Sequence, residues 1–137
     1  LVTPDTCINL NSNQYEDGYY KIDHQTIKTL LDFSFKGFPV LKNGLFMGFV
    51  PRDQLQKYKT LHWISEVWFS MDLQNVSNSI DDEQLVFVGN DYLRMSENQD
   101  VWVLLEYFKR LGLKYVFIVE NQRLIGMVTK KDLLCRT

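Results

Sequence analysis

Four residues near the C-terminus combine three kinds of functional group at the start of a predicted helix. Thr129, Lys130, Lys131 and Asp132 supply a hydroxyl, two ammonium groups and a carboxylate within one turn. Unpaired N–H groups at a helix start favour anions, and a carboxylate can accept from two neighbouring hydroxyls at once. The pattern therefore indicates a small polar site that includes an anion. The alternative is a capping box in which Thr129 and Asp132 only close the helix start and the lysines are solvated.

The sequence predicts no catalytic residue and no metal site. It has no nucleophile paired with a base, no convincing carboxylate pair and no glycine-rich phosphate loop. His24 and His62 lie in polar contexts that are typical of surface positions or caps. Cys7 and Cys135 lie near opposite ends without metal-ligand spacing, so we expect two reduced thiols in a cytosolic protein. We expect a protein that is not an enzyme.

Length and composition indicate one folded domain. The chain has 137 residues, of which 45% are hydrophobic and 14% aromatic, enough for a core without disulfides or metals. Its net charge of −2 and the lack of a basic run argue against nucleic acid as a partner. No apolar run approaches the roughly 20 residues that span a bilayer, and no signal peptide is present. Because the chain begins with Leu1, we expect it to be a piece of a larger protein.

The same pattern occurs twice, 78 positions apart. Residues 41–50 align with residues 119–128, and each copy is an apolar strand, a polar turn and a second strand interrupted by glycine. A helix precedes each hairpin, the first from an Asp23 cap to about residue 33 and the second over residues 101–111. Self-similarity at a fixed period indicates one structural unit used twice. We expect the two units to pack together, with any ligand at their seam.

Further elements follow from local patterns. We expect strands near residues 7–10, 38–41, 45–50, 85–88, 116–119 and 123–128, helices over residues 52–58 and from 130 onward, a tight turn at Asn43-Gly44 and a glycine C-cap at Gly112. Residues 60–90 break the repeat, and we interpret them as the connection between a first motif, 1–59, and a second, 91–137. Trp63, Trp68 and Phe69 in this connection either face a partner or cover the core.

Several motifs resemble the CBS (cystathionine β-synthase) domain. An apolar strand with Gly126, followed by Thr129-x-x-Asp132 at a helix start, is similar to the closing signature of that family. The segment Gly37-Phe38-Pro39-Val40 resembles its apolar-Pro-Val strand. The resemblance covers nearly the whole chain. It implies an α/β (α+β) fold, a tandem CBS pair of two pseudo-symmetric β-α-β-β-α units related by a pseudo-twofold axis, with both sheets facing across one core.

A narrower resemblance concerns the cytosolic tail of eukaryotic CLC chloride channels and exchangers, particularly the intracellular, yeast-type branch. It rests on residues 36–40, 108–113 and 126–132. It implies a cytosolic regulatory domain of a chloride channel or chloride/proton exchanger in a Golgi, endosomal or vacuolar membrane. The partners would be the transmembrane domain of the same polypeptide and a second copy in a homodimer. The alternatives are a dimerisation or trafficking module with an empty cleft, or a nucleotide-sensing CBS pair of a kinase regulatory subunit or metabolic enzyme.

The resemblance also implies a regulatory ligand, although no required cofactor. In several relatives the pair binds ATP, ADP or AMP in the cleft between the repeats. An adenine base would stack on Phe35 and Pro39, in the loop that also holds Lys36 and Gly37. Asp132 would hold the ribose, and Thr129 with Lys131 the phosphates.

The matching cleft of the first unit is predicted to be empty. Pro51 stands where the second unit has Thr129, and it lacks both a hydroxyl and an N–H group. Gln54 stands where the second unit has Asp132. We therefore expect one ligand site and not two.

Overall fold

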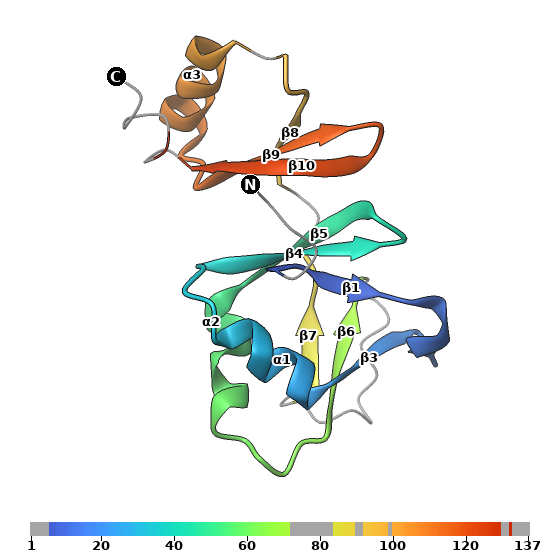
Figure 1. Ribbon diagram of the computed structural model, residues 1–137. Coiled ribbons are helices and arrows are strands. Elements are labelled where there is room, and N and C mark those ends of the chain that lie inside the picture. The colour runs from blue at the N-terminus through green and yellow to red at the C-terminus, as the bar shows by residue number, and fades with distance from the viewer. Residues whose placement is uncertain (1–5, 72–83, 90–91, 99, 130–131, 133–137) are drawn as a thin grey trace.

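Figure 1 shows the computed structural model of the chain, which describes residues 6–71, 84–89, 92–98, 100–129 and 132. No helix within these ranges is long and apolar enough to cross a membrane. The elements are, in order, β1 (Ile8–Leu10), η2 (Ser12–Gln14), β2 (Tyr15–Glu16), β3 (Tyr19–Asp23), α1 (His24–Leu31), β4 (Gly37–Lys42), β5 (Leu45–Pro51), α2 (Arg52–Leu55), η3 (Gln56–Lys59), β6 (Glu66–Ser70), β7 (Leu85–Phe87), β8 (Arg94–Met95), α3 (Val101–Leu111), β9 (Tyr115–Glu120) and β10 (Arg123–Thr129).

Both helices that precede the hairpins begin where side-chain chemistry predicts, and α3 also ends at its predicted glycine cap, whereas α1 ends at Leu31, about two residues before the predicted end. Asp23 caps α1 by accepting a hydrogen bond from the Gln25 N–H at 3.1 Å, and Asp100 caps α3 by accepting from the Trp102 N–H at 2.8 Å. The apolar face of α1 is buried, as its periodicity predicts. Gly112 ends α3 with a φ of 61°, a left-handed conformation that glycine adopts without strain.

The two predicted hairpins are β4–β5 and β9–β10. In the first turn, Asn43 and Gly44 have φ values of 53° and 80°, as the Asn-Gly pair predicts. In the second turn, Asn121 and Gln122 take the same positions with φ values of 51° and 66°. The repeat therefore conserves the turn conformation even where glycine is replaced by glutamine.

The sheet arrangement differs from the prediction of two sheets facing across one core. The hairpins join edge to edge in a single sheet with the order β1-β4-β5-β10-β9-β8. The joint is narrow: Leu45 pairs with Arg123, and the Phe46 N–H donates to the Gln122 carbonyl at 2.9 Å. The strand order nevertheless keeps the expected pseudo-twofold relation, because β1 runs parallel to β4 just as β8 runs parallel to β9.

In the described part of the chain, three separate hydrophobic clusters hold these elements together. The largest belongs to the first unit and includes Ile27 and Phe69, and a smaller one lies between α3 and β9 around Leu104 and Phe108. The third spans the seam, where Phe46, Phe49 and Phe117 are buried together. Each unit thus has its own packing, and aromatic side chains connect the two.

The segment 60–90, which the sequence predicts to be a connection, contributes two strands, β6 and β7, to the first unit. β6 pairs with β3 and β7 pairs with β6, forming a sheet of order β2-β3-β6-β7. Figure 1 shows β3, β6 and β7 beside α1. Phe69 is 0% exposed within the first core, so the interface role considered for it is wrong. Trp68 is half-buried and stacked on Tyr19, whereas Trp63 is 63% exposed. Two of these three aromatic residues, Trp68 and Phe69, therefore pack in or against the core, as one of the two alternatives predicts.

Candidate functional site

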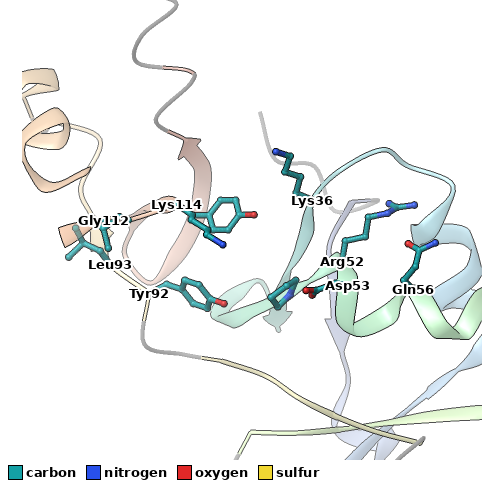
Figure 2. A pocket seen from close by; sticks show the side chains of 11 residues that line it. Lys36, Arg52, Asp53, Gln56, Tyr92, Leu93, Gly112 and Lys114 are labelled. Atoms are coloured by element: carbon teal, nitrogen blue, oxygen red, sulfur yellow. The ribbon is translucent and has the colours of Figure 1, made fainter. Parts of the chain in front are cut away.

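A pocket of about 820 Å³ lies between the two units. Pocket volumes of roughly 300–1,000 Å³ are typical of small-molecule sites. Figure 2 shows the side chains of the first unit on one side of the pocket and those of the second unit on the other. The lining residues are Lys36, Pro51, Arg52, Asp53, Gln56, Tyr92, Leu93, Gly112, Leu113, Lys114 and Tyr115.

The first-unit side of the pocket is built by the end of β5 and the start of α2. Pro51 ends the strand and Arg52 begins the helix, so that the exposed Asp53 and Gln56 follow within one turn. The Arg52 N–H donates to the Lys36 carbonyl at 2.7 Å, which holds the entry to β4 beside the start of α2. An exposed ammonium group and a carboxylate thereby reach the same pocket.

The second-unit side is positioned by the end of α3. The left-handed Gly112 turns the chain from the helix towards β9, and Leu113, Lys114 and Tyr115 follow directly. Tyr92 completes this side, and its ring lies 5.5 Å from that of Phe117 and 5.3 Å from that of Phe49. The seam cluster therefore anchors Tyr92 against both units while the ring also lines the pocket.

Arg52 lines the pocket, but its guanidinium group is bonded to backbone carbonyls. Nη2 donates to the Leu31 carbonyl at 2.7 Å, and Nη1 donates to the carbonyls of Phe33 and Phe35, the latter at 3.3 Å. These carbonyls lie at the C-terminal end of α1 and in the loop that follows, where a cation is favoured. The cations that remain exposed along the pocket are Lys36 and Lys114.

Of the seven predicted ligand-binding residues, the structure places Lys36 in this pocket. Phe35 is 45% exposed and stacked on Phe33 with ring centroids 5.7 Å apart, so its predicted stacking role stays a prediction. Gly37 and Pro39 are buried in β4 and offer no exposed face to a base. Lys131 lies outside the described residues.

Thr129 and Asp132 form the capping box that the sequence left open as an alternative. The Thr129 N–H donates to Asp132 Oδ2 at 2.9 Å, and the Asp132 N–H donates to Thr129 Oγ1 at 3.3 Å. The arrangement accounts for both side chains without a ligand. It also leaves Asp132 exposed, so a ribose contact stays a prediction.

Most of the pocket-lining residues were not predicted from the sequence, although the internal repeat indicates one of them. Lys114 is the counterpart of Lys36 at the 78-residue offset, and these two lysines line one pocket. The cleft beside Pro51 was predicted to be empty because the hydroxyl of the matching threonine is missing. The pocket nevertheless lies beside Pro51. Its lining includes the carboxylate of Asp53, one residue before Gln54, the counterpart of Asp132.

The pocket is therefore suited to an anionic ligand that also has an apolar part and hydrogen-bond donors. Two exposed ammonium groups from different units favour a phosphate or another multivalent anion. Tyr92 and Tyr115 offer aromatic surface for a flat group. Asp53 adds a carboxylate that can accept hydrogen bonds from hydroxyls.

Comparisons with known proteins agree on the fold. Residues 88–136, which correspond to the second unit, match the sequence model described as the CBS domain. No curated protein sequence matches the chain.

Solved structures resemble the chain over nearly its whole length at low sequence identity. OpuCA from Staphylococcus aureus is 10% identical with a TM-score of 0.56, over 95% of this chain and 89% of that one. The CBS domain of a putative transporter from Clostridium difficile 630 is 19% identical with a TM-score of 0.54, over 95% and 83%. CBSX2, solved in complex with AMP, is 11% identical with a TM-score of 0.56, over 95% and 84%. At such identities the likeness shows the fold.

Proposed function

We propose that the chain is a regulatory module that binds an adenine nucleotide between its two units, because residues 88–136 match the CBS-domain model and the fold resembles that of solved CBS-domain proteins. The observation that carries the proposal is the pocket at the seam, with one exposed lysine from each unit. A ligand that contacts both units favours the conformation in which they are held together. Such differential affinity is what regulation by a ligand requires.

The proposed ligand fits the chemistry of the lining residues. The phosphates lie between Lys36 and Lys114, the base packs on Tyr92 and Tyr115, and Asp53 accepts from the ribose hydroxyls. The likeness to CBSX2, which was solved with AMP, supports the class of ligand. Binding at the cleft between Phe35 and Asp132 stays the second candidate, supported by the exposed ring of Phe35 and the exposed carboxylate of Asp132.

Titration calorimetry with ATP, ADP and AMP tests the proposal. Each of Lys36→Ala and Lys114→Ala is expected to weaken ATP binding about fivefold, since an exposed charge pair contributes up to about 1 kcal/mol. Lys109→Ala is the matched control, because Lys109 is exposed on α3 and is not part of the pocket lining. If no nucleotide gives heat at millimolar concentration, the binding function is refuted and the structural-module alternative stands.

We propose further that the module is the cytosolic regulatory domain of a membrane transporter of the CLC type. Support comes from the resemblance of residues 36–40, 108–113 and 126–132 to such tails and from the likeness to the CBS domain of a putative transporter. The location would be the cytosolic face of an intracellular membrane. The coding sequence upstream of Leu1 tests this: membrane-spanning helices are expected there, and a kinase subunit or a metabolic enzyme would contradict the proposal.

Self-association is the last part of the proposal. Trp102 on α3 is 69% exposed and Trp63 is 63% exposed, and large exposed aromatic residues are typical of interfaces. We expect the chain to dimerise at least weakly. Sedimentation equilibrium at high protein concentration measures this, and a strict monomer would contradict a homodimeric face on this module.

A further inference from the structure

Arg52 is the only side chain that lines the pocket and also donates to the carbonyls of residues 31–35, among the interactions described for this part of the chain. Its guanidinium group reaches three of these carbonyls, those of Leu31, Phe33 and Phe35. Its own N–H donates to the carbonyl of Lys36. One residue thus contacts the backbone at four points between the end of α1 and the start of β4.

The segment that Arg52 contacts has little other support. Hydrogen bonds of the α1 end reach as far as residue 33, where the Phe33 N–H donates to the Leu30 carbonyl at 3.1 Å. Beyond that point Ser34, Phe35 and Lys36 are exposed. The side chains of Phe33 and Phe35 stack on each other. The segment therefore depends on Arg52 to fix its backbone.

The charge of Arg52 suits this role better than direct ligand binding. No carboxylate forms a salt bridge with Arg52 within the described ranges, so its charge is balanced by carbonyl groups, including that of Leu31 at the end of α1. In Figure 2 its side chain extends away from Tyr92 and the second unit. A planar guanidinium group can serve several carbonyls at once, whereas an ammonium group lacks that fixed fork.

We propose that Arg52 is a positioning residue that clamps residues 31–36 and thereby sets Lys36 at the pocket. The inference deepens the proposed function, because Lys36 is one of the two exposed lysines on which anion binding depends. Arg52 would then increase the affinity for the anion indirectly, by positioning Lys36. Arg52 both clamps the segment and lines the pocket, so a ligand in the pocket and an ordered segment would support each other.

The first test does not need a ligand. Chymotrypsin cleaves after phenylalanine, and Phe33 and Phe35 lie in the clamped segment. Arg52→Lys keeps the charge but loses the fork, and it is expected to speed cleavage at these two sites about tenfold under native conditions. Arg110→Lys, at an exposed arginine of α3, is the control and is expected to leave cleavage unchanged. Unchanged cleavage in Arg52→Lys and in the shorter, neutral variant Arg52→Gln would overturn the clamp.

Cleavage sites distinguish local release from unfolding. Phe46 and Tyr58 are buried, so cleavage there reports loss of the whole fold. Cleavage after Phe33 and Phe35 with the buried sites protected supports the clamp. Cleavage that rises equally at all four sites would contradict a local role for Arg52.

The second test measures coupling between Arg52 and Lys36 by a double-mutant cycle on ATP affinity. Arg52→Lys is expected to weaken ATP binding about fivefold in the parent chain and less than twofold in the Lys36→Ala background. Equal effects in both backgrounds would overturn the positioning role. If the parent chain binds no ATP, the proposed function fails, and the cleavage experiment alone decides whether Arg52 clamps the segment.

Discussion

Lys36 and Lys114 show how an internal repeat can build a site from two equivalent residues. Each lysine precedes the first strand of its hairpin, and the pseudo-twofold relation brings both to one pocket. Lys36 was predicted as a ligand-binding residue from resemblance, but Lys114 was not. The 78-residue offset contained that information, because a pseudo-twofold axis maps any residue near the seam onto its counterpart across it.

Side-chain patterns predicted local roles better than roles at the seam. The caps Asp23 and Asp100 were predictable because a cap acts within its own turn. The hydrogen bonds of the Arg52 guanidinium group were not, since they join residues 17 to 21 positions apart and leave no periodic signature. The same reason hid Tyr92, whose ring packs on Phe49 and Phe117 from distant parts of the chain.

Cys7 gives a prediction at the residue scale for alkaline pH. Burial raises the pKa of its thiol from 9.0 to about 11, and the hydrogen bond with Thr6 opposes this shift. Between these values the unfolded chain loses the thiol proton while the folded chain keeps it, so stability falls as the pH rises. Urea unfolding from pH 8 to 11 should therefore show a steeper loss of stability in the parent chain than in Cys7→Ala. Parallel curves would contradict the assignment.

At the scale of elements, the sequence located the repeated parts well and the intervening ones poorly. α3 spans Val101–Leu111 as predicted, and β1, β4, β5, β9 and β10 lie close to their expected ranges. Within residues 60–90, which the sequence predicts to be a connection, β7 lies close to the strand expected at residues 85–88, whereas β6 was not expected. β6 pairs with β3, over 40 residues earlier in the chain, and β7 pairs with β6; sequence periodicity does not reveal such long-range pairing.

Alanine substitutions at Gly48 and Gly126 provide a matched test of the packing of β5. They are counterparts in the repeat, but a Cβ at Gly48 would overlap the Gly89 carbonyl oxygen and lie 2.7 Å from a Val88 methyl carbon. A Cβ at Gly126 would meet nothing within 4 Å. Gly48→Ala should thus lower the free energy of unfolding by about 1–3 kcal/mol, and Gly126→Ala should change it little. Equal losses in denaturant melts would contradict the close approach of β5 and residues 88–89.

At the scale of the whole molecule, the units share a backbone joint at Leu45 and Arg123 together with an aromatic cluster. The prediction of two facing sheets was wrong because strand periodicity identifies a buried face but not which free edge pairs. The pseudo-twofold order of the strands was implied by the repeat and is present. The position of the pocket follows from this joint, since it brings the start of α2 close to the end of α3.

The seam itself gives a prediction for stability. The rings of Phe46 and Phe117 lie 4.7 Å apart and belong to different units. A double-mutant cycle with alanine at both positions should give a coupling energy of about 0.5–1.5 kcal/mol in urea unfolding. Phe46 with Phe108, which belongs to the separate α3 cluster, should give near-additive effects. Additivity at Phe46 and Phe117 would contradict the packing of the units.

The most direct test of the central claim asks which cleft holds the nucleotide, by calorimetric titration of ATP into Asp53→Ala and Asp132→Ala. Asp53 lines the pocket between the units, whereas Asp132 is hydrogen-bonded to Thr129. A hydrogen bond to a charged group contributes about 1.5–3 kcal/mol, so the loss of the ribose acceptor should weaken binding roughly ten- to a hundredfold. We predict that loss for Asp53→Ala and less than a twofold change for Asp132→Ala. The reverse pattern, or ATP binding that neither substitution alters, would contradict a nucleotide site in this pocket.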